Sequence, residues 1–263
     1  MMKTKVDSQF TDEMQNDLFE IEDRSWWFQY RAKLLSILAG KYFRKQVVTY
    51  DIGGGNGYTT HYLQQEGYEM ALVEPTVDAC NNGRKRGLKR VICGTVDDLQ
   101  EKVEQITCLD VLEHIEDDKA FLSSLNEHLN DKGHLLLTVP AFNILWSSED
   151  DVAGHFRRYR VQEITALVEN CGFEVLYASY FYQFLFLPIL LIRVGLEKIG
   201  ILKRADMRSV EEKRKISRQQ FKKRGKLITA ILDFLAVREQ KIISTDSVIN
   251  FGSSIVIMAE KVK

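Results

Sequence analysis

The chain has 263 residues, which suits one large domain or one domain with an appendage. Of these residues 45% are apolar and 28% charged, and the formal net charge is −1, as is ordinary for a soluble globular protein. A spanning helix is excluded because no stretch reaches about 18 uninterrupted apolar residues. The first residues also lack the apolar core of a signal peptide. Four scattered cysteines without a CxxC pair predict buried, reduced thiols in a cytoplasmic protein.

Short apolar runs rich in β-branched residues alternate with longer amphipathic stretches along most of the chain. Strands are predicted at 47–53, 69–75, 90–94, 105–111, 133–140, 173–181 and 249–261. Helices are predicted near 58–66, 77–88, 97–102, 117–129 and 161–170, the last ending at Cys171-Gly172. This alternation predicts an α/β fold with a doubly wound, mostly parallel sheet that helices cover on both faces.

Two segments do not follow the alternation. One is an N-terminal helical cap, 1–40, and the other is a helical, basic insertion, 182–245, before the last strand. The remainder, 1–181 plus 246–263 with the cap included, is predicted to be the ligand-binding domain.

The stretch TYDIGGGNGYTT (49–60) places an aspartate and four glycines between a predicted strand and a predicted helix. Such a turn lets a ligand approach backbone N–H groups beside the positive end of the helix. The dinucleotide pattern G-x-G-x-x-G fails, because Tyr58 and Thr60 stand where glycine is needed. The pattern that is present is D-x-G-x-G-x-G.

This loop resembles the nucleotide loop of class I S-adenosylmethionine-dependent methyltransferases. The resemblance implies a Rossmann-like methyltransferase fold of seven strands with the last antiparallel, and S-adenosylmethionine as cofactor, with S-adenosylhomocysteine as product. It also implies that the first-strand acid and the loop hold the methionine part of the cofactor. The residues concerned are Asp51, Gly53, Gly54, Gly55 and Gly57.

Further along, Glu74 and Pro75 end the second predicted strand, where an acid can accept both ribose hydroxyls. A solvated turn glutamate is the alternative interpretation. The third strand ends in CGTVDDL, where the family usually has G-D-A-x-x-L with an aspartate that contacts adenine. Thr95 replaces that aspartate, so the adenine contact falls to Thr95, Val96 or the two aspartates that follow.

The fourth strand continues into CLDVLEHIEDD, which is similar to the D-V-L-E-H-I segment of the family's small-molecule and ubiquinone-type branch. The resemblance implies that Asp110 and Val111 contact the cofactor at the carboxyl end of a central strand. His114 follows, either near the ligand or as a core histidine. Downstream, Gly133 matches one glycine of the family's L-x-x-G-G-x-L pattern, and Lys132 occupies the other's place.

The loop after the fifth strand contains WSSEDDVAGHFRRYR and resembles a segment of a bacterial branch of the family. His155 has a suitable unperturbed pKa for a general base, and Arg157 and Tyr159 are candidates to orient the acceptor. The alternative is that Arg157, Arg158 and Arg160 form a solvated cap before the next helix. No set of metal ligands is recognised in the sequence.

WWFQYR (Trp26–Arg31) is similar to an element that precedes the glycine loop in the same branch. Adjacent tryptophans on a helix point in different directions, so one packs into the core and the other covers cofactor or substrate. Arg31 is then expected near the methionine carboxylate.

The insertion begins with an apolar run, 180–193, and its residues 193–226 hold 13 lysines and arginines against 4 acidic residues. This pattern suits an anionic membrane face or a lid over a lipid-like substrate. Packing on the domain or on a homodimer partner is the alternative. Nucleic acid is not expected, because the basic run has few aromatic residues.

The sequence therefore predicts methyl transfer to a small or lipid-linked acceptor, with O-methylation favoured over C- or N-methylation. The predicted location is cytoplasmic, peripheral at the inner membrane face if the insertion binds lipid. A membrane-associated, cofactor-binding scaffold without catalysis is one alternative, and a nucleotide-dependent oxidoreductase is another.

Overall fold

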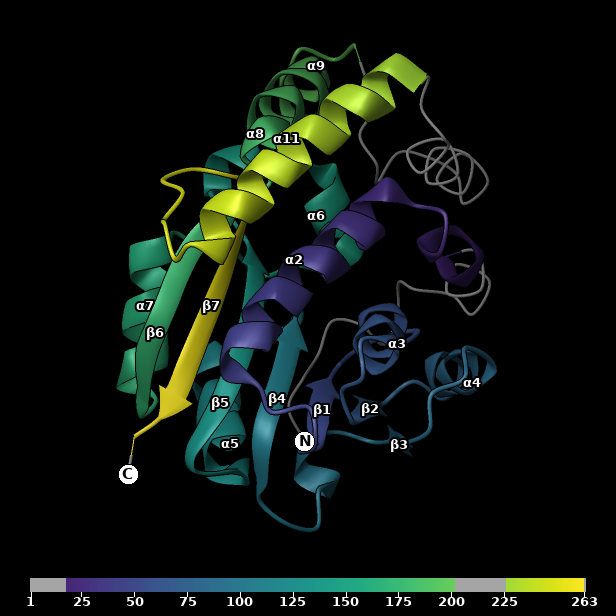
Figure 1. Ribbon diagram of the computed structural model, residues 1–263. Helices are drawn as coiled ribbons and strands as arrows, with labels where there is room; N and C mark the ends of the chain where they lie inside the picture. The colour runs from purple at the N-terminus through teal and green to yellow at the C-terminus, as the bar shows by residue number, and fades with distance from the viewer. Residues whose placement is uncertain (1–17, 202–225, 263) are drawn as a thin grey trace.

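The computed structural model describes residues 18–201 and 226–262, which form a seven-stranded sheet flanked by helices (Figure 1). The strands are β1 (Thr49–Ile52), β2 (Met70–Glu74), β3 (Val91–Cys93), β4 (Val103–Leu109), β5 (Leu129–Pro140), β6 (Phe173–Phe181) and β7 (Ser254–Lys261). The longer helices are α2 (Trp26–Tyr42), α3 (Tyr58–Gln65), α4 (Val77–Lys85), α5 (Asp118–His128), α7 (Val161–Asn170) and α11 (Lys226–Ser244). Shorter helical segments are η2 (Val96–Asp98), η3 (Leu112–His114), η4 (Asn143–Leu145), α6 (Ser148–Ala153), α8 (Gln183–Pro188), η5 (Ile189–Gly195) and α9 (Leu196–Lys198).

The strand order is β3-β2-β1-β4-β5-β7-β6. The first five strands in this order are parallel, and β7 runs antiparallel to both of its neighbours. The predicted mostly parallel sheet with an antiparallel last strand is confirmed. The order reverses between β1 and β4, and open α/β sheets bind ligands outside the strand ends at such a switch point.

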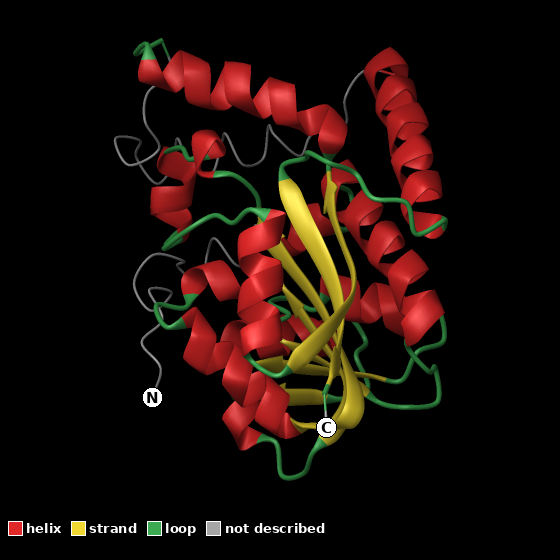
Figure 2. Cartoon of the chain, turned by 90° about the vertical axis from the view of Figure 1, so that its left-hand side faces the viewer, coloured by secondary structure: helices red, strands yellow, loops and turns green. Residues whose placement is uncertain are grey.

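The core of the sheet is buried on both faces, as the continuous apolar runs predict. All five residues of β2 are buried, and so are seven of the eight residues of β7. Figure 2 shows helices on both sides of the strands. The carboxyl ends of β1 and β4 point toward the end of the molecule where α6, α8 and α11 lie (Figure 1).

Several element boundaries differ from the prediction. The helix expected at 97–102 is only the short η2, because the side chain of Asp98 turns back to cap the backbone N–H of Thr95. Strand β5 begins at Leu129 rather than Gly133, since Leu129 already pairs with Val103 before an irregularity. Lys132 lies in this irregularity with a φ of 64°, a conformation that favours glycine. All four cysteines are free, but Cys93 is exposed rather than buried.

The cap and the insertion meet at the top of Figure 1, where α2 and α11 run side by side. Glu239 of α11 accepts hydrogen bonds from Tyr30 of α2 and from the backbone N–H groups of Tyr182 and Gln183, at 2.7 and 2.8 Å for the last two. Most of the predicted basic run, 202–225, lies outside the described residues, as do residues 1–17 of the cap. None of the described helices combines the length and apolar character needed to cross a membrane.

Candidate functional site

The glycine loop between β1 and α3 has three glycines at positive φ, namely Gly53, Gly55 and Gly57. A Cβ added at Gly53 would lie 2.7 Å from the side chain of Val111, and one at Gly57 would lie 2.6 Å from Leu88. At Gly55 a Cβ would meet no atom within 4 Å. Two of these glycines therefore serve the protein's own packing, whereas Gly55 faces open space beside bare backbone.

Asp51 lies near the end of β1, beneath this loop, and is 1% exposed. Its two carboxylate oxygens accept hydrogen bonds from the hydroxyls of Thr60, at 2.5 Å, and Thr107, at 2.7 Å. A Cβ at Gly54 would lie 2.5 Å from the same carboxylate. Burial raises the pKa of Asp51, and the two hydroxyl donors oppose that rise. These contacts tie the loop to α3 and β4.

Glu74 ends β2 next to the open position of the loop. One carboxylate oxygen accepts the N–H of Gly55 at 3.0 Å, and the other accepts the N–H of Thr76 at 3.1 Å. Each oxygen keeps acceptor capacity for a further donor. Pro75, which follows, is exposed.

Arg31 reaches from α2 to the loop after β4, where its guanidinium pairs with Asp110. The other Asp110 oxygen accepts the hydroxyl of Thr138 on β5 at 2.9 Å, and Asp110 has a φ of 57°. Burial lowers the pKa of Arg31, but the nearby Asp110 carboxylate outweighs it and the net pKa is raised. The Nε of Arg31 is buried without a hydrogen-bond partner.

The residues expected to contact adenine lie in the turn after β3. Thr95 is exposed and Val96 is buried. The side chain of Asp98 is bonded to the backbone N–H of Thr95 at 2.7 Å, and Asp97 accepts the hydroxyl of Ser124 at 3.0 Å. Both acidic side chains therefore have partners within the protein.

The segment before α2 also reaches the glycine loop, a contact that the sequence reading missed. The carboxylate of Glu22 pairs with Arg86 at 2.7 Å and accepts the side-chain amide of Asn56 at 3.3 Å. Burial raises the pKa of Glu22 to about 7, although Arg86 and Asn56 act in the opposite direction. An acidic residue in a polar N-terminal stretch gives no local signal for such a contact.

His155 lies in the loop after α6, oriented by a buried carboxylate. Its Nδ1 lies 2.8 Å from Asp150, which also accepts the Nε–H of Arg158 at 2.7 Å. Asp150 additionally accepts the backbone N–H of Ser147. These donors lower the pKa of Asp150 to about 2 despite its burial. The alternative of a solvated arginine cap does not hold for Arg158, because its side chain is buried and also donates to the carbonyl of Ala141.

Arg157 and Tyr159, the candidates for acceptor contact, both bind Asp118 at the start of α5. The Arg157 guanidinium lies 2.5 Å from the Asp118 carboxylate, and the Tyr159 hydroxyl donates to it at 3.0 Å. Burial raises the pKa of Tyr159, and the Asp118 carboxylate adds to the rise. These contacts hold the loop against α5.

Glu113 and His114, on η3 directly after Asp110 and Val111, lie beside His155. The imidazole rings of His114 and His155 meet edge to face with their centroids 4.7 Å apart. Glu113 is 1% exposed, and its Oε2 and the Nδ1 of His114 are buried without hydrogen-bond partners. Burial and the neighbouring His155 ring lower the pKa of His114 to about 4. Burial raises the pKa of Glu113 well above its usual value.

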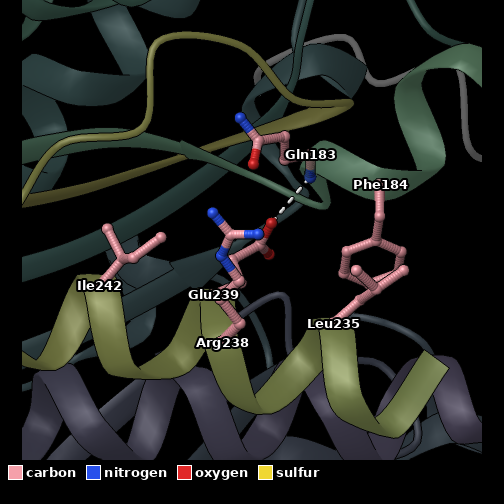
Figure 3. A pocket seen from close by; sticks show the side chains of 6 residues that line it. All are labelled: Gln183, Phe184, Leu235, Arg238, Glu239 and Ile242. Carbon is pink, nitrogen blue, oxygen red and sulfur yellow. Dashed lines mark hydrogen bonds between the residues drawn. The ribbon is translucent and has the colours of Figure 1, made fainter. Parts of the chain in front are cut away.

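Two cavities lie away from the glycine loop. The first has a volume of about 110 Å³ and lies next to Glu239. Figure 3 shows it, with a dashed line for the hydrogen bond between Glu239 and Gln183. Its lining residues are Gln183, Phe184, Leu235, Arg238, Glu239 and Ile242. The second, of about 370 Å³, is lined by mixed charges that include Arg44, Glu104, Lys132 and Glu260. Neither is lined by a residue expected to bind the cofactor.

Comparisons with known proteins agree with this fold. A family model described as a methyltransferase domain matches residues 28–178. A structure of a complex between the Haloferax volcanii Trm112 methyltransferase activator and a candidate methyltransferase is similar, with a TM-score of 0.60, 13% identity and full coverage of both chains.

Two further structures are similar in fold. The Haemonchus contortus phosphoethanolamine N-methyltransferase 2 with S-adenosyl-L-methionine has a TM-score of 0.58 and 16% identity, covering 98% of this chain and 59% of that one. The [4+2]-cyclase SpnF has a TM-score of 0.55 and 16% identity, covering 90% and 83%. No curated protein matches the sequence.

Proposed function

Since the chain belongs to the methyltransferase-domain family and is a class I S-adenosylmethionine-dependent methyltransferase, we propose that it methylates an oxygen of a small or lipid-linked acceptor. The observation that supports the proposed binding mode is the open space at Gly55 next to the Glu74 carboxylate. Bound there, S-adenosylmethionine supplies an electrophilic methyl group.

The residues around this space fit the cofactor's chemistry. We assign Glu74 to the ribose hydroxyls, because both of its oxygens retain acceptor capacity. We assign the unpartnered Nε of Arg31 to the methionine carboxylate and Asp110 to the neighbouring ammonium. The contacts of Asp51 support an indirect role, in which it fixes the loop from below. For the adenine ring we propose the turn at Thr95 and Val96, with the Val96 backbone as the contact, since Asp98 already binds the N–H of Thr95.

On the acceptor side we propose His155 as the base that takes the proton of the acceptor hydroxyl. Asp150 accepts from Nδ1, which leaves Nε2 as the basic nitrogen. The bonds of Arg157 and Tyr159 to Asp118 support a role in holding this loop rather than direct acceptor contact.

The cofactor assignment is tested by calorimetric titration of S-adenosylhomocysteine into the full chain. We expect saturable binding to the wild type and at least tenfold weaker binding to Glu74→Gln and Arg31→Lys. Glu69→Gln is the matched control, since Glu69 is exposed and directly precedes the same strand. Absence of binding by the folded wild type would overturn the assignment.

Methyl transfer needs its own test, because a similar fold also occurs in a [4+2]-cyclase. The protein is incubated with methyl-labelled S-adenosylmethionine and a panel of phenolic, sugar and lipid-linked hydroxyl acceptors. We expect label on an acceptor oxygen and a large loss of turnover, with cofactor affinity kept, in His155→Asn. Binding without turnover on any acceptor would favour the scaffold alternative.

We also propose that the insertion contacts an anionic membrane face. Large apolar side chains of α11 are exposed with helical spacing, which places them along one side: Leu227 (75%), Ile228, Ile231, Phe234 (69%) and Val237. Flotation with phosphatidylglycerol vesicles is expected for the wild type and not for Leu227→Glu or Phe234→Glu. A concentration-dependent dimer that these same substitutions dissociate would instead assign the face to a second copy.

A further inference from the structure

Three potential metal ligands converge beside the proposed acceptor region. Glu113, His114 and His155 each offer a ligand atom, and these atoms all lie within 4.8 Å of one another. Glu113 and His114 follow β4, whereas His155 comes from the loop after α6, 41 positions after His114. The sequence reading recognised no metal site because ligand spacing along the chain does not connect these two loops.

Two atoms of this cluster are left without partners in the interior. The Oε2 of Glu113 and the Nδ1 of His114 are both buried and make no hydrogen bond. Leaving one such group unsatisfied costs about 1–3 kcal/mol, so two adjacent ones are unusual in a stable fold. Both are atoms that donate a lone pair to a metal ion, which would offset that cost.

The third ligand is already oriented. Asp150 is buried and holds the Nδ1 of His155 at 2.8 Å, so that Nε2 is left as the ligand atom. A carboxylate that fixes the second nitrogen of a ligating histidine is the usual outer contact of such sites. Arg158 and Ser147 hold Asp150 in turn.

We propose that Glu113, His114 and His155 bind one divalent transition-metal ion, Zn²⁺ in first place, with Asp150 as the residue that positions His155. Two imidazoles and one carboxylate suit zinc and its first-row neighbours, whereas Mg²⁺ and Ca²⁺ prefer oxygen ligands alone. Bonds of about 2.0–2.2 Å in a tetrahedral arrangement place ligand atoms about 3.3 Å apart. The cluster reaches that spacing by a small inward movement of its side chains.

Three protein ligands leave one tetrahedral position open, as in catalytic rather than structural zinc sites. In terms of the proposed function, on which this part rests, an acceptor hydroxyl is the group that fits that position. A metal-bound His155 has no free Nε2, so the ion and the histidine base are alternative ways to activate the same acceptor. Metal binding itself does not depend on methyl transfer.

The test is direct titration of metal into the full, untagged chain after dialysis against a chelator. We expect calorimetry with Zn²⁺ to give one ion per chain and Co²⁺ to give the visible absorption of a low-coordinate site. Glu113→Gln, His114→Asn and His155→Asn should each weaken binding more than tenfold, and Asp150→Asn about 10–100-fold.

The controls are Glu116→Gln, an exposed carboxylate on the same loop, and His61→Asn, a histidine on α3. Both should bind Zn²⁺ as the wild type does. No saturable binding by the folded wild type, or equal binding by the cluster variants and the controls, would overturn the proposal. S-adenosylhomocysteine is titrated into the same samples, so that loss of the metal site and failure of cofactor binding are told apart.

Discussion

The cofactor side and the acceptor side of the strand ends differ in how their buried polar groups are satisfied. On the cofactor side, both oxygens of Asp51 and both of Glu74 accept hydrogen bonds from the protein. On the acceptor side, Glu113 and His114 each keep a buried atom without a partner. The paired carboxylates hold the cofactor side together, whereas the unpartnered atoms, like the Arg31 Nε on the cofactor side, fit the pattern expected where a ligand completes the structure.

The largest expected difference in unfolding free energy is between removal of the hydrogen-bonded carboxylate of Asp51 and removal of the unsatisfied carboxyl group of Glu113. Asp51→Ala leaves the buried hydroxyls of Thr60 and Thr107 without their acceptor and should cost about 2–6 kcal/mol of unfolding free energy. Glu113→Met removes an unsatisfied carboxyl at similar volume and should leave the metal-free protein as stable or more stable. Chemical denaturation in the presence of a chelator measures both. Equal destabilisation by the two variants would contradict the difference between the satisfied Asp51 and the unsatisfied Glu113.

The glycine loop allows a finer comparison. Gly53→Ala adds a Cβ against Val111 at a positive φ and should cost about 2–5 kcal/mol. Gly55→Ala carries only the conformational cost, about 1–2 kcal/mol, because its Cβ enters open space. Yet Gly55→Ala should lose S-adenosylhomocysteine affinity at least tenfold while it remains folded. Thermal melts with and without ligand separate the two outcomes, and a Gly55→Ala protein that binds normally would contradict the proposed cofactor position.

A pH-dependent contribution is expected where the N-terminal segment covers the loop. The pKa of Glu22 is raised from 4.5 to about 7 in the folded state, so its contribution to stability is fully present below pH 4.5 and is lost as pH rises to about 7. Relative to Glu22→Gln, the wild type should lose about 1–3 kcal/mol between pH 4.5 and 8. Denaturant titrations of both proteins across this range measure the difference. A constant gap between the two curves would show that Arg86 keeps Glu22 ionised throughout.

The smallest effect is expected far from both sites, at Lys132. Its φ of 64° is strained for a side chain, so Lys132→Gly should change stability by less than about 1 kcal/mol, in the stabilising direction. The pair that Lys132 makes with Glu260 is exposed and contributes little. A Lys132→Ala variant, which keeps the strain, is the control in the same thermal melts.

The sequence predicted the strands and the glycine loop, but not the contacts between distant segments. The D-x-G-x-G-x-G pattern predicted the loop, because glycine spacing is local information. It could not assign each glycine, since Val111 and Leu88, which crowd Gly53 and Gly57, come from other elements. The same limit applies to Asp118, whose bonds to Arg157 and Tyr159 join two loops. The departure at Lys132 was visible in the sequence, and its backbone conformation explains why glycine is usual there.

The position of β7 has a consequence for how the chain acquires its structure. Strand β6 has β7 as its neighbour in the sheet, and β7 is the last of the seven described strands in chain order. Until β7 is synthesised, β6 has no partner in the sheet and β5 has an open edge. The contact between Glu239 and Tyr30, 209 positions apart, also forms only after most of the chain has been synthesised. Such long-range closure slows folding and leaves strand edges open to mispairing. Deletion of residues 254–261 should therefore yield aggregates rather than a smaller folded domain.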